Sequence, residues 1–105
     1  MVSYDDFMKM EIKIGTILEA ERVPNTDKLL KLVVDLGSEK RQLVAGIGAK
    51  YSPEDIIGKQ VPVLANLEAA TIRGVESNGM ILCADSGVPI LLLPAEEVAK
   101  GSKVK

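Results

Sequence analysis

Hydrophobic and polar residues alternate over several stretches of this chain, and a period of two predicts β-strands. The first strand is predicted at residues 11–23, where every second side chain faces the same side of a sheet. That side would carry Ile12, Ile14, Thr16, Leu18 and Ala20. Gly15 lies in the middle of the strand and predicts a bulge or bend, which helps to curl a sheet into a barrel.

Further strands are predicted at residues 28–36, 41–45, 61–67 and 80–84, separated by Gly-, Asn- and Ser-containing turns. Short helices are also expected. Ser3 is a candidate N-cap for residues 4–9, and Ser52 followed by Pro53 begins a helix that Gly58 ends. One short helix after three strands, with at least two strands beyond it, predicts an all-β, five-stranded oligonucleotide/oligosaccharide-binding (OB-fold) barrel.

The run Val88-Pro89-Ile90-Leu91-Leu92-Leu93 is almost entirely apolar. A strand without polar alternation needs burial on both faces. We therefore expect Val88, Ile90, Leu91, Leu92 and Leu93 to lie in a subunit interface. Coverage of this strand by the N-terminal helix is the alternative explanation.

The length of 105 residues is sufficient for one domain, spanning 1–105, with a modest aliphatic core. No apolar run approaches the roughly 20 residues that cross a bilayer, and the acidic-polar N-terminus is unlike a signal peptide. The single cysteine, Cys83, excludes an internal disulfide and fits a reducing compartment. We expect a cytoplasmic protein without membrane contact.

The charge distribution excludes a general polyanion binder, because the net charge is -2 and the pI is about 5.1. Residues 22–50 are nevertheless locally positive, with six basic residues against three acidic ones, which gives +3 and leaves -5 for the rest of the chain. A positive face on an acidic body is compatible with selective nucleic-acid contact, but chance scatter of charges produces the same pattern.

Residues for catalysis or metal binding are scarce. The chain contains no histidine and one cysteine, so a zinc site is excluded by its ligand count, and no nucleophile–base set can be assembled. The acidic pairs at 5–6, 54–55 and 96–97 each begin a predicted helix, where the helix dipole accounts for them. We expect no enzyme, no catalytic residue, no metal and no cofactor.

The candidate ligand-binding residues lie on or beside predicted strands, and several belong to the polar segment at 68–78. The cations in outward-facing positions are Lys13, Lys28, Lys31, Arg41 and Arg73. On an open barrel face they could bind phosphates, although surface ion pairs are a common alternative. Ser77 could instead belong to a turn at Asn78-Gly79, Met80 to the core, and Asn66 to a turn that it stabilises internally.

Five elements along the chain together resemble the tRNA-binding domain found at the C-terminus of methionyl-tRNA synthetases and in free-standing dimeric tRNA-binding proteins. They occur in the family's order across nearly the whole chain. They are Ile12-Lys13-Ile14-Gly15-Thr16-Ile17, Pro24-Asn25-Thr26-Asp27-Lys28-Leu29, Tyr51-Ser52-Pro53-Glu54-Asp55 with Gly58-Lys59, Ala65-Asn66-Leu67, and Arg73-Gly74-Val75-Glu76-Ser77-Asn78-Gly79-Met80.

The resemblance implies an OB-fold core with a C-terminal extension, a homodimer, and tRNA bound by its shape and backbone, with an aminoacyl-tRNA synthetase as a partner. By position, it implies backbone contacts for Lys13, Lys28, Arg41 and Arg73, whereas Asn66, Ser77 and Met80 would shape or touch the site. This chain has Glu68-Ala69-Ala70-Thr71 where the family often has basic residues, so weak binding is expected.

Two other functions are compatible with the sequence. A related branch of the same fold contains dimeric chaperone or export-related proteins that bind peptides, and the apolar run at 88–93 favours this reading. A purely structural dimerisation domain of a synthetase is the third possibility.

Overall fold

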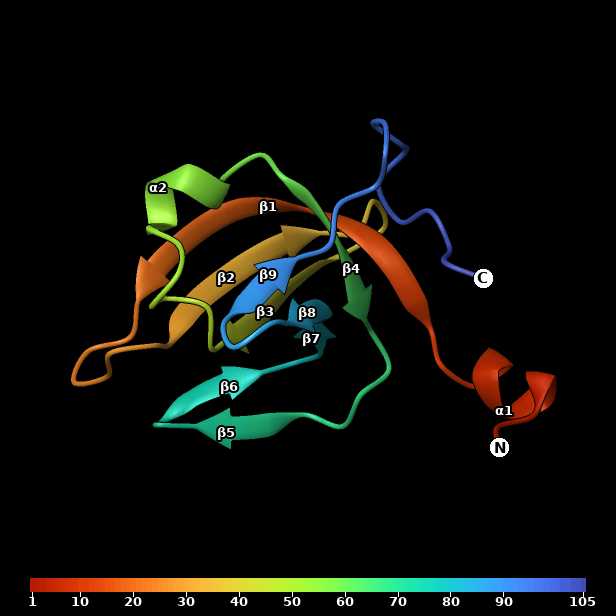
Figure 1. Cartoon of the computed structure of the whole chain (residues 1–105), viewed down its shortest axis with the longest axis horizontal. Coiled ribbons are helices and arrows are strands. Elements are labelled where there is room, and N and C mark those ends of the chain that lie inside the picture. The colour runs from red at the N-terminus through yellow and green to blue at the C-terminus, as the bar shows by residue number, and fades with distance from the viewer.

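The computed structural model describes all residues from 1 to 105 and consists mainly of short antiparallel strands (Figure 1). One five-stranded sheet contains, in spatial order, β3 (Lys40–Ala45), β2 (Leu30–Asp35), β1 (Ile12–Arg22), β4 (Gln60–Leu64) and β7 (Met80–Ile81). Two hairpins follow, formed by β5 (Ala70–Ile72) with β6 (Val75–Ser77) and by β8 (Cys83–Asp85) with β9 (Pro89–Leu91). The helices are α1 (Tyr4–Met8) and α2 (Pro53–Ile56).

The sheet curls into a nearly closed barrel, in which the two halves of the long strand β1 pair with different strands. Its second half pairs with β2, and its first half pairs with β4 on the other edge. Residues around the end of β6 close the gap to β3: the Asn78 amide donates to the Gln42 carbonyl at 2.9 Å, and the Val44 amide donates to the Ser77 hydroxyl at 3.0 Å. With α2 between β3 and β4, the predicted all-β OB-fold barrel is confirmed.

The barrel core is aliphatic, as the alternation in the sequence predicts. Leu30, Leu32 and Val34 of β2 are fully buried, and they belong to a cluster of 14 buried residues. Branched aliphatic side chains fill the space between curled strands well, and each contributes roughly 1.5–3 kcal/mol when it is fully removed from water.

The predicted alternation of β1 is wrong in the middle of the strand. The pairing with β2 shifts register between Ile17 and Glu19, so Ile17 is fully buried and Leu18 is only half-buried. The irregularity therefore lies at Leu18, and not at Gly15 as predicted. Gly15 has a different role, because a Cβ atom there would lie 2.9 Å from Cδ2 of Leu36.

The predicted helices at residues 4–9 and 53–58 are present and shorter than expected, whereas the helix predicted to begin at residues 96–97 is absent. The Ser3 hydroxyl accepts a hydrogen bond from the Asp6 amide at 3.1 Å, which confirms it as the N-cap of α1. Ser52 has the extended backbone of an N-cap before Pro53 but makes no side-chain hydrogen bond. Neither helix is long or apolar enough to cross a membrane.

The polar segment at 68–78 is more regular than its sequence suggests, since it forms the β5–β6 hairpin. Its turn is Arg73-Gly74, and not Asn78-Gly79. The strand predicted at 80–84 is also divided: β7 pairs with β4, whereas β8 pairs with β9.

The C-terminal extension continues the sheet along the first half of β1, at the edge that β2 does not reach. The Gly101 amide donates to the Ile14 carbonyl at 2.7 Å, the Ile14 amide to the Ser102 carbonyl at 2.8 Å, and the Val104 amide to the Ile12 carbonyl at 2.8 Å. These bonds satisfy backbone groups of β1 that would otherwise form an open edge.

Candidate nucleic-acid interface

Two loops far apart in sequence meet in one pocket of about 430 Å³, which we call the loop pocket. It is lined by Asn25–Leu29 of the β1–β2 loop and by Ile72 and Arg73 of the β5–β6 hairpin. Lys28 and Arg73 are both exposed, and neither forms an ion pair within the chain. The fold thus brings together two of the predicted cations with their charges available to a ligand.

The backbone of the loop pocket has unusual conformations. Asn25, with φ of 62°, and Arg73, with φ of 52°, are the two residues other than glycine with positive φ. Arg73 and Gly74 (φ 81°) form the two-residue turn between Ile72 and Val75, the geometry of a type I′ hairpin turn. Asparagine adopts this conformation readily, whereas arginine does so at a cost of about 1–2 kcal/mol.

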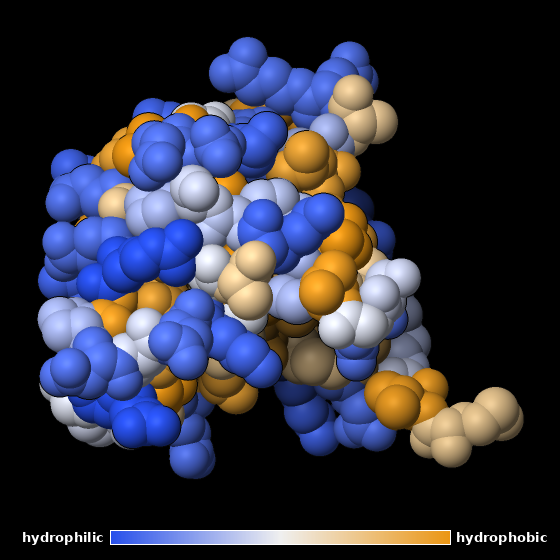
Figure 2. All heavy atoms as spheres, turned by 60° about the vertical axis from the view of Figure 1, so that its left-hand side comes forward, coloured by the Kyte–Doolittle hydropathy of each residue, from blue (hydrophilic) through white to orange (hydrophobic).

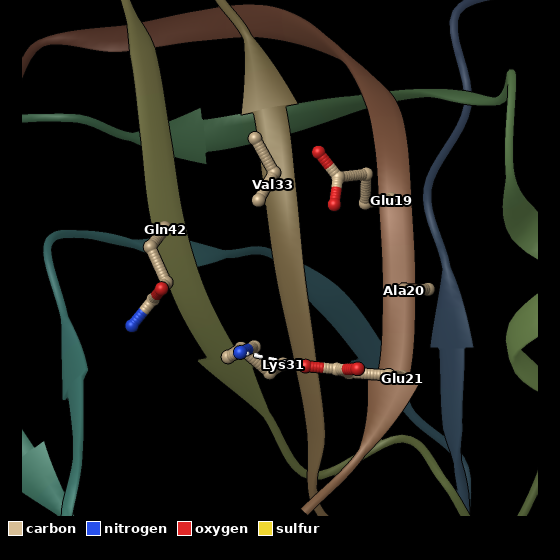
Figure 3. Close-up of a pocket in the computed structure, with 6 residues that line it drawn as sticks. All are labelled: Glu19, Ala20, Glu21, Lys31, Val33 and Gln42. Atoms are coloured by element: carbon tan, nitrogen blue, oxygen red, sulfur yellow. Dashed lines mark ion pairs between the residues drawn. The ribbon is translucent and has the colours of Figure 1, made fainter.

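Beside the loop pocket, the outer surface of β1, β2 and β3 forms a groove of about 230 Å³, which we call the sheet-face groove. Glu19, Ala20, Glu21, Lys31, Val33 and Gln42 line it (Figure 3). Lys31 and Glu21 are direct cross-strand partners, and the Lys31 Nζ lies 2.6 Å from Glu21 Oε1. The charge of Lys31 is therefore offset within the chain, as the surface-ion-pair alternative predicts.

The other predicted cations lie elsewhere. The Arg41 guanidinium donates from Nη1 to the carbonyls of Ala65 (2.5 Å) and Asn78 (3.3 Å), and from Nε to the carboxylate of Glu39. Arg41 also lowers the pKa of Glu39 through this contact. Its donors thus connect the barrel strands and stabilise the closure.

Lys13 lies in the first half of β1, with its Nζ 3.8 Å from Glu11 Oε1. It is not among the residues that line the loop pocket. Lys13 is therefore not brought together with Lys28 and Arg73.

The three predicted polar or sulfur-containing contacts have internal partners. Asn66 accepts from the Glu11 amide and donates to the Lys9 carbonyl, both at 2.8 Å, which matches the turn alternative. Ser77 is 3% exposed, and its hydroxyl also donates to the Gly79 carbonyl at 3.0 Å. Without that hydroxyl, the buried Val44 amide would lose its acceptor, at a cost of about 1–3 kcal/mol. Met80 is half-buried opposite Leu64.

Comparison with known proteins decides the family. Residues 12–103 match the model of the family described as "Putative tRNA binding domain". The chain belongs to this family. It is 50% identical over 104 residues to the methionine–tRNA ligase of Thermotoga maritima and 52% identical over 105 residues to that of Methanoregula boonei. These alignments cover 98% and 100% of the chain and 16% of each ligase, so the chain spans about a sixth of these relatives.

Solved structures of free-standing relatives have the same fold as this tRNA-binding domain. A methionyl-tRNA synthetase-related protein from Pyrococcus horikoshii is 36% identical, with a TM-score of 0.93, and the match covers 100% of this chain and 98% of that one. The chaperone CsaA from Bacillus anthracis is 30% identical, with a TM-score of 0.90, and the match covers 100% and 99% of the two chains. The resemblance inferred from the sequence is confirmed.

Sequence reasoning missed three polar residues of the tRNA-binding domain that line the sheet-face groove: Glu19, Glu21 and Gln42. The opposite charges of Glu21 and Lys31 could have indicated a cross-strand pair. The pairing itself depends on the register shift at Leu18, which moves every later residue of β1 relative to β2.

The apolar run at 88–93 is divided between core and surface in this domain. Leu91 is 8% exposed and belongs to the barrel core, so its burial needs no second subunit. Val88, Leu92 and Leu93 are 42%, 43% and 52% exposed, and we call these three residues the apolar edge. Figure 2 shows hydrophobic side chains in small groups on a surface that is otherwise mainly hydrophilic.

The remaining candidate chemistry is limited. No group of three or more carboxylate, cysteine or histidine side chains lies close enough to hold a metal ion. Burial raises the pKa of the Cys83 thiol, which keeps it protonated and weakly nucleophilic at neutral pH.

Proposed function

We propose that this domain is a non-catalytic tRNA-binding module, acting in the cytoplasm as part of, or as a separate partner to, a methionine–tRNA ligase. It binds the RNA backbone through the loop pocket and raises the affinity of the ligase for tRNA. The observation that carries this proposal is the meeting of Lys28 and Arg73, two cations without partners in the chain, in one pocket.

The local charge supports RNA as the ligand, because Lys28 and Arg73 against Asp27 give the loop pocket a formal charge of +1, although the protein as a whole is acidic. Phosphates need cations that are free and close together, and the other predicted cations, Lys13, Lys31 and Arg41, are held by carboxylates or carbonyl groups. Membership of the tRNA-binding domain family and the identity with methionine–tRNA ligases support tRNA among the possible RNAs.

Because the loop pocket offers only two cations, we expect a modest affinity for RNA. Two phosphate contacts per protomer correspond to a salt slope of roughly -1.5 to -2 on a log–log plot. A homodimer formed through the apolar edge would present two loop pockets to one large RNA, and such bivalency increases the observed affinity without any new contact.

The test is a titration of fluorescein-labelled tRNA, followed by anisotropy, at about 50 mM and about 200 mM salt. The expected loss of affinity between the two is about tenfold. Lys28→Ala and Arg73→Ala should each weaken binding several-fold and reduce the magnitude of the salt slope by about 1. Lys59→Ala is the matched control, because Lys59 is exposed and unpaired but lies outside both the loop pocket and the sheet-face groove.

Two results would contradict the proposal. One is the absence of tRNA binding even at low salt, and the other is an equal effect of the Lys59, Lys28 and Arg73 substitutions.

A peptide-binding chaperone is the second candidate, supported by the likeness to CsaA and by the exposed apolar edge. It predicts that the domain suppresses aggregation of a heat-denatured test enzyme, and that Leu93→Glu abolishes this effect. A dimerisation domain without a ligand, the third possibility, predicts neither activity.

A further inference from the structure

The sheet-face groove has a chemistry that does not suit phosphate. Its ionisable groups are two carboxylates and one ammonium group, so its formal charge is -1. Glu21 is paired with Lys31, whereas the Glu19 carboxylate forms no ion pair or hydrogen bond within the chain. Figure 3 shows that the Glu19 carboxylate extends from β1 across the groove towards Val33 of β2. Glu19 is therefore an available acceptor next to an apolar side chain.

Gln42 forms the far side of the groove and offers a second acceptor. Its Nε2 donates to the Glu76 carbonyl at 2.8 Å, which leaves its Oε1 free. This bond also holds the β5–β6 hairpin, which carries Arg73 at its turn, beside β3. The groove thus presents acceptors to a ligand that must supply N–H donors.

We propose that the sheet-face groove binds an unpaired guanine base of the RNA, with the Glu19 carboxylate accepting hydrogen bonds from guanine N1–H and N2–H. This inference rests on the proposed function. Guanine has two adjacent N–H donors on its Watson–Crick edge, which match the two oxygens of one carboxylate. Adenine, cytosine and uracil each place an acceptor next to the donor on that edge, and this acceptor repels the second carboxylate oxygen.

The dimensions of the site fit a single nucleotide next to a backbone contact. The groove volume of about 230 Å³ is sufficient for one base, and Val33 supplies apolar surface below it. Lys31 is three residues after Lys28, so the groove begins within about 10 Å of the loop pocket. Recognition of unpaired bases through their Watson–Crick edges is the usual source of sequence preference in RNA-binding domains.

The experiment compares three fluorescein-labelled single strands of about seven nucleotides, within the site size of an OB-fold. One contains only uridine, the second has a central guanosine, and the third a central inosine, which lacks the N2 amino group. The guanosine strand should bind at least about fivefold more tightly than the uridine strand, the lower limit for a bidentate base contact, and inosine should lose most of this advantage.

Substitution of Glu19 separates base recognition from general electrostatics. Removal of a negative charge alone would strengthen the binding of every strand. Glu19→Gln should instead weaken the guanosine strand while it strengthens the uridine strand. Glu76→Gln is the matched control, because it makes the same charge change on the adjacent hairpin, outside the groove, and should strengthen all three strands equally.

Equal affinities for the guanosine and inosine strands would overturn the inference, as would an equal gain for all strands in Glu19→Gln. If tRNA still binds with the expected salt dependence in that case, the proposed function stands and only the base assignment fails. If neither tRNA nor any strand binds, both fail.

Discussion

At the scale of single residues, Arg73 shows a conflict between stability and charge. A type I′ turn favours Asn-Gly, and this chain has Arg-Gly there, with arginine in the left-handed region. Such conformations collect at functional sites, where the surrounding structure holds them. The arginine therefore places a cation at the hairpin tip at a cost in stability.

The corresponding prediction compares two substitutions. Arg73→Asn should raise the unfolding free energy by about 0.5–1 kcal/mol, because asparagine tolerates positive φ, whereas Arg73→Ala keeps the strain and should not. Both should weaken tRNA binding equally, since both remove the same charge. Thermal denaturation and anisotropy measure the two effects, and a stable Arg73→Asn variant with unchanged tRNA affinity would show that the charge has no role.

The sequence was sufficient to name Lys28 and Arg73 as candidate ligand contacts. It was not sufficient to separate them from the other candidate residues. Lys28, Arg73, Arg41 and Ser77 are equally plausible contacts when only their positions along strands are known. The structure distinguishes them, because Ser77 is buried and the Arg41 guanidinium donates to two backbone carbonyls. These partners are more than 20 residues away along the chain, so local sequence carries no information about them.

At the scale of elements, the C-terminal extension is attached by an ion pair as well as by backbone bonds. The Asp35 carboxylate at the end of β2 accepts from the Gly37 amide at 2.9 Å and from Lys100 Nζ at 3.1 Å. The Gly37 hydrogen bond and the bond to Lys100 lower the pKa of Asp35 below its ordinary value of 3.8. A lowered pKa means that the ionised form stabilises the fold.

This linkage predicts a pH-dependent effect of Asp35→Asn. The contribution of Asp35 is fully present above its ordinary pKa of 3.8 and is lost as the pH falls through the lowered pKa of the folded state. Asp35→Asn should therefore lower the melting temperature at pH 7 by more than it does at the acidic end. Glu97→Gln, at an exposed carboxylate without a partner, is the control. A difference that stays constant down to acidic pH would contradict the assignment.

Element prediction succeeded where burial is strongly periodic and failed where strands are short. The three fully buried side chains of β2 make its alternation clear, whereas β5 and β6 have three residues each and few buried side chains. Their hairpin depends on contacts to β3, such as the bond between Gln42 and Glu76, which no local pattern reveals.

At the scale of the whole molecule, the apolar edge is the surface on which the predicted homodimer depends. Its three aliphatic side chains are 42–52% exposed and flank β9, with Val88 in the turn before it and Leu92 and Leu93 after it. Exposed apolar residues that cluster are typical of interaction surfaces, and a second copy of the chain is the partner that the family resemblance implies.

Leu93→Glu tests this interface. Because Leu93 is 52% exposed, the substitution should leave the monomer folded but place a charge in the interface. We expect light scattering to show a dimer for the native chain at micromolar concentration and a monomer for the variant, with weaker tRNA binding. Leu67→Glu, at a leucine that is 44% exposed after β4, should remain dimeric. A native chain that is monomeric at this concentration would remove the basis for bivalent binding.

The pairing of Val104 with Ile12 also has a consequence for how this domain can be joined to other polypeptides. It keeps the last residues beside the start of β1, and Figure 1 shows both termini on the side of the molecule away from the β1–β2 loop and the hairpin tip. A fusion at either end would therefore leave these two loops unobstructed. The same small barrel can thus be an appendage or an independent protein without any change in the side that carries the loop pocket.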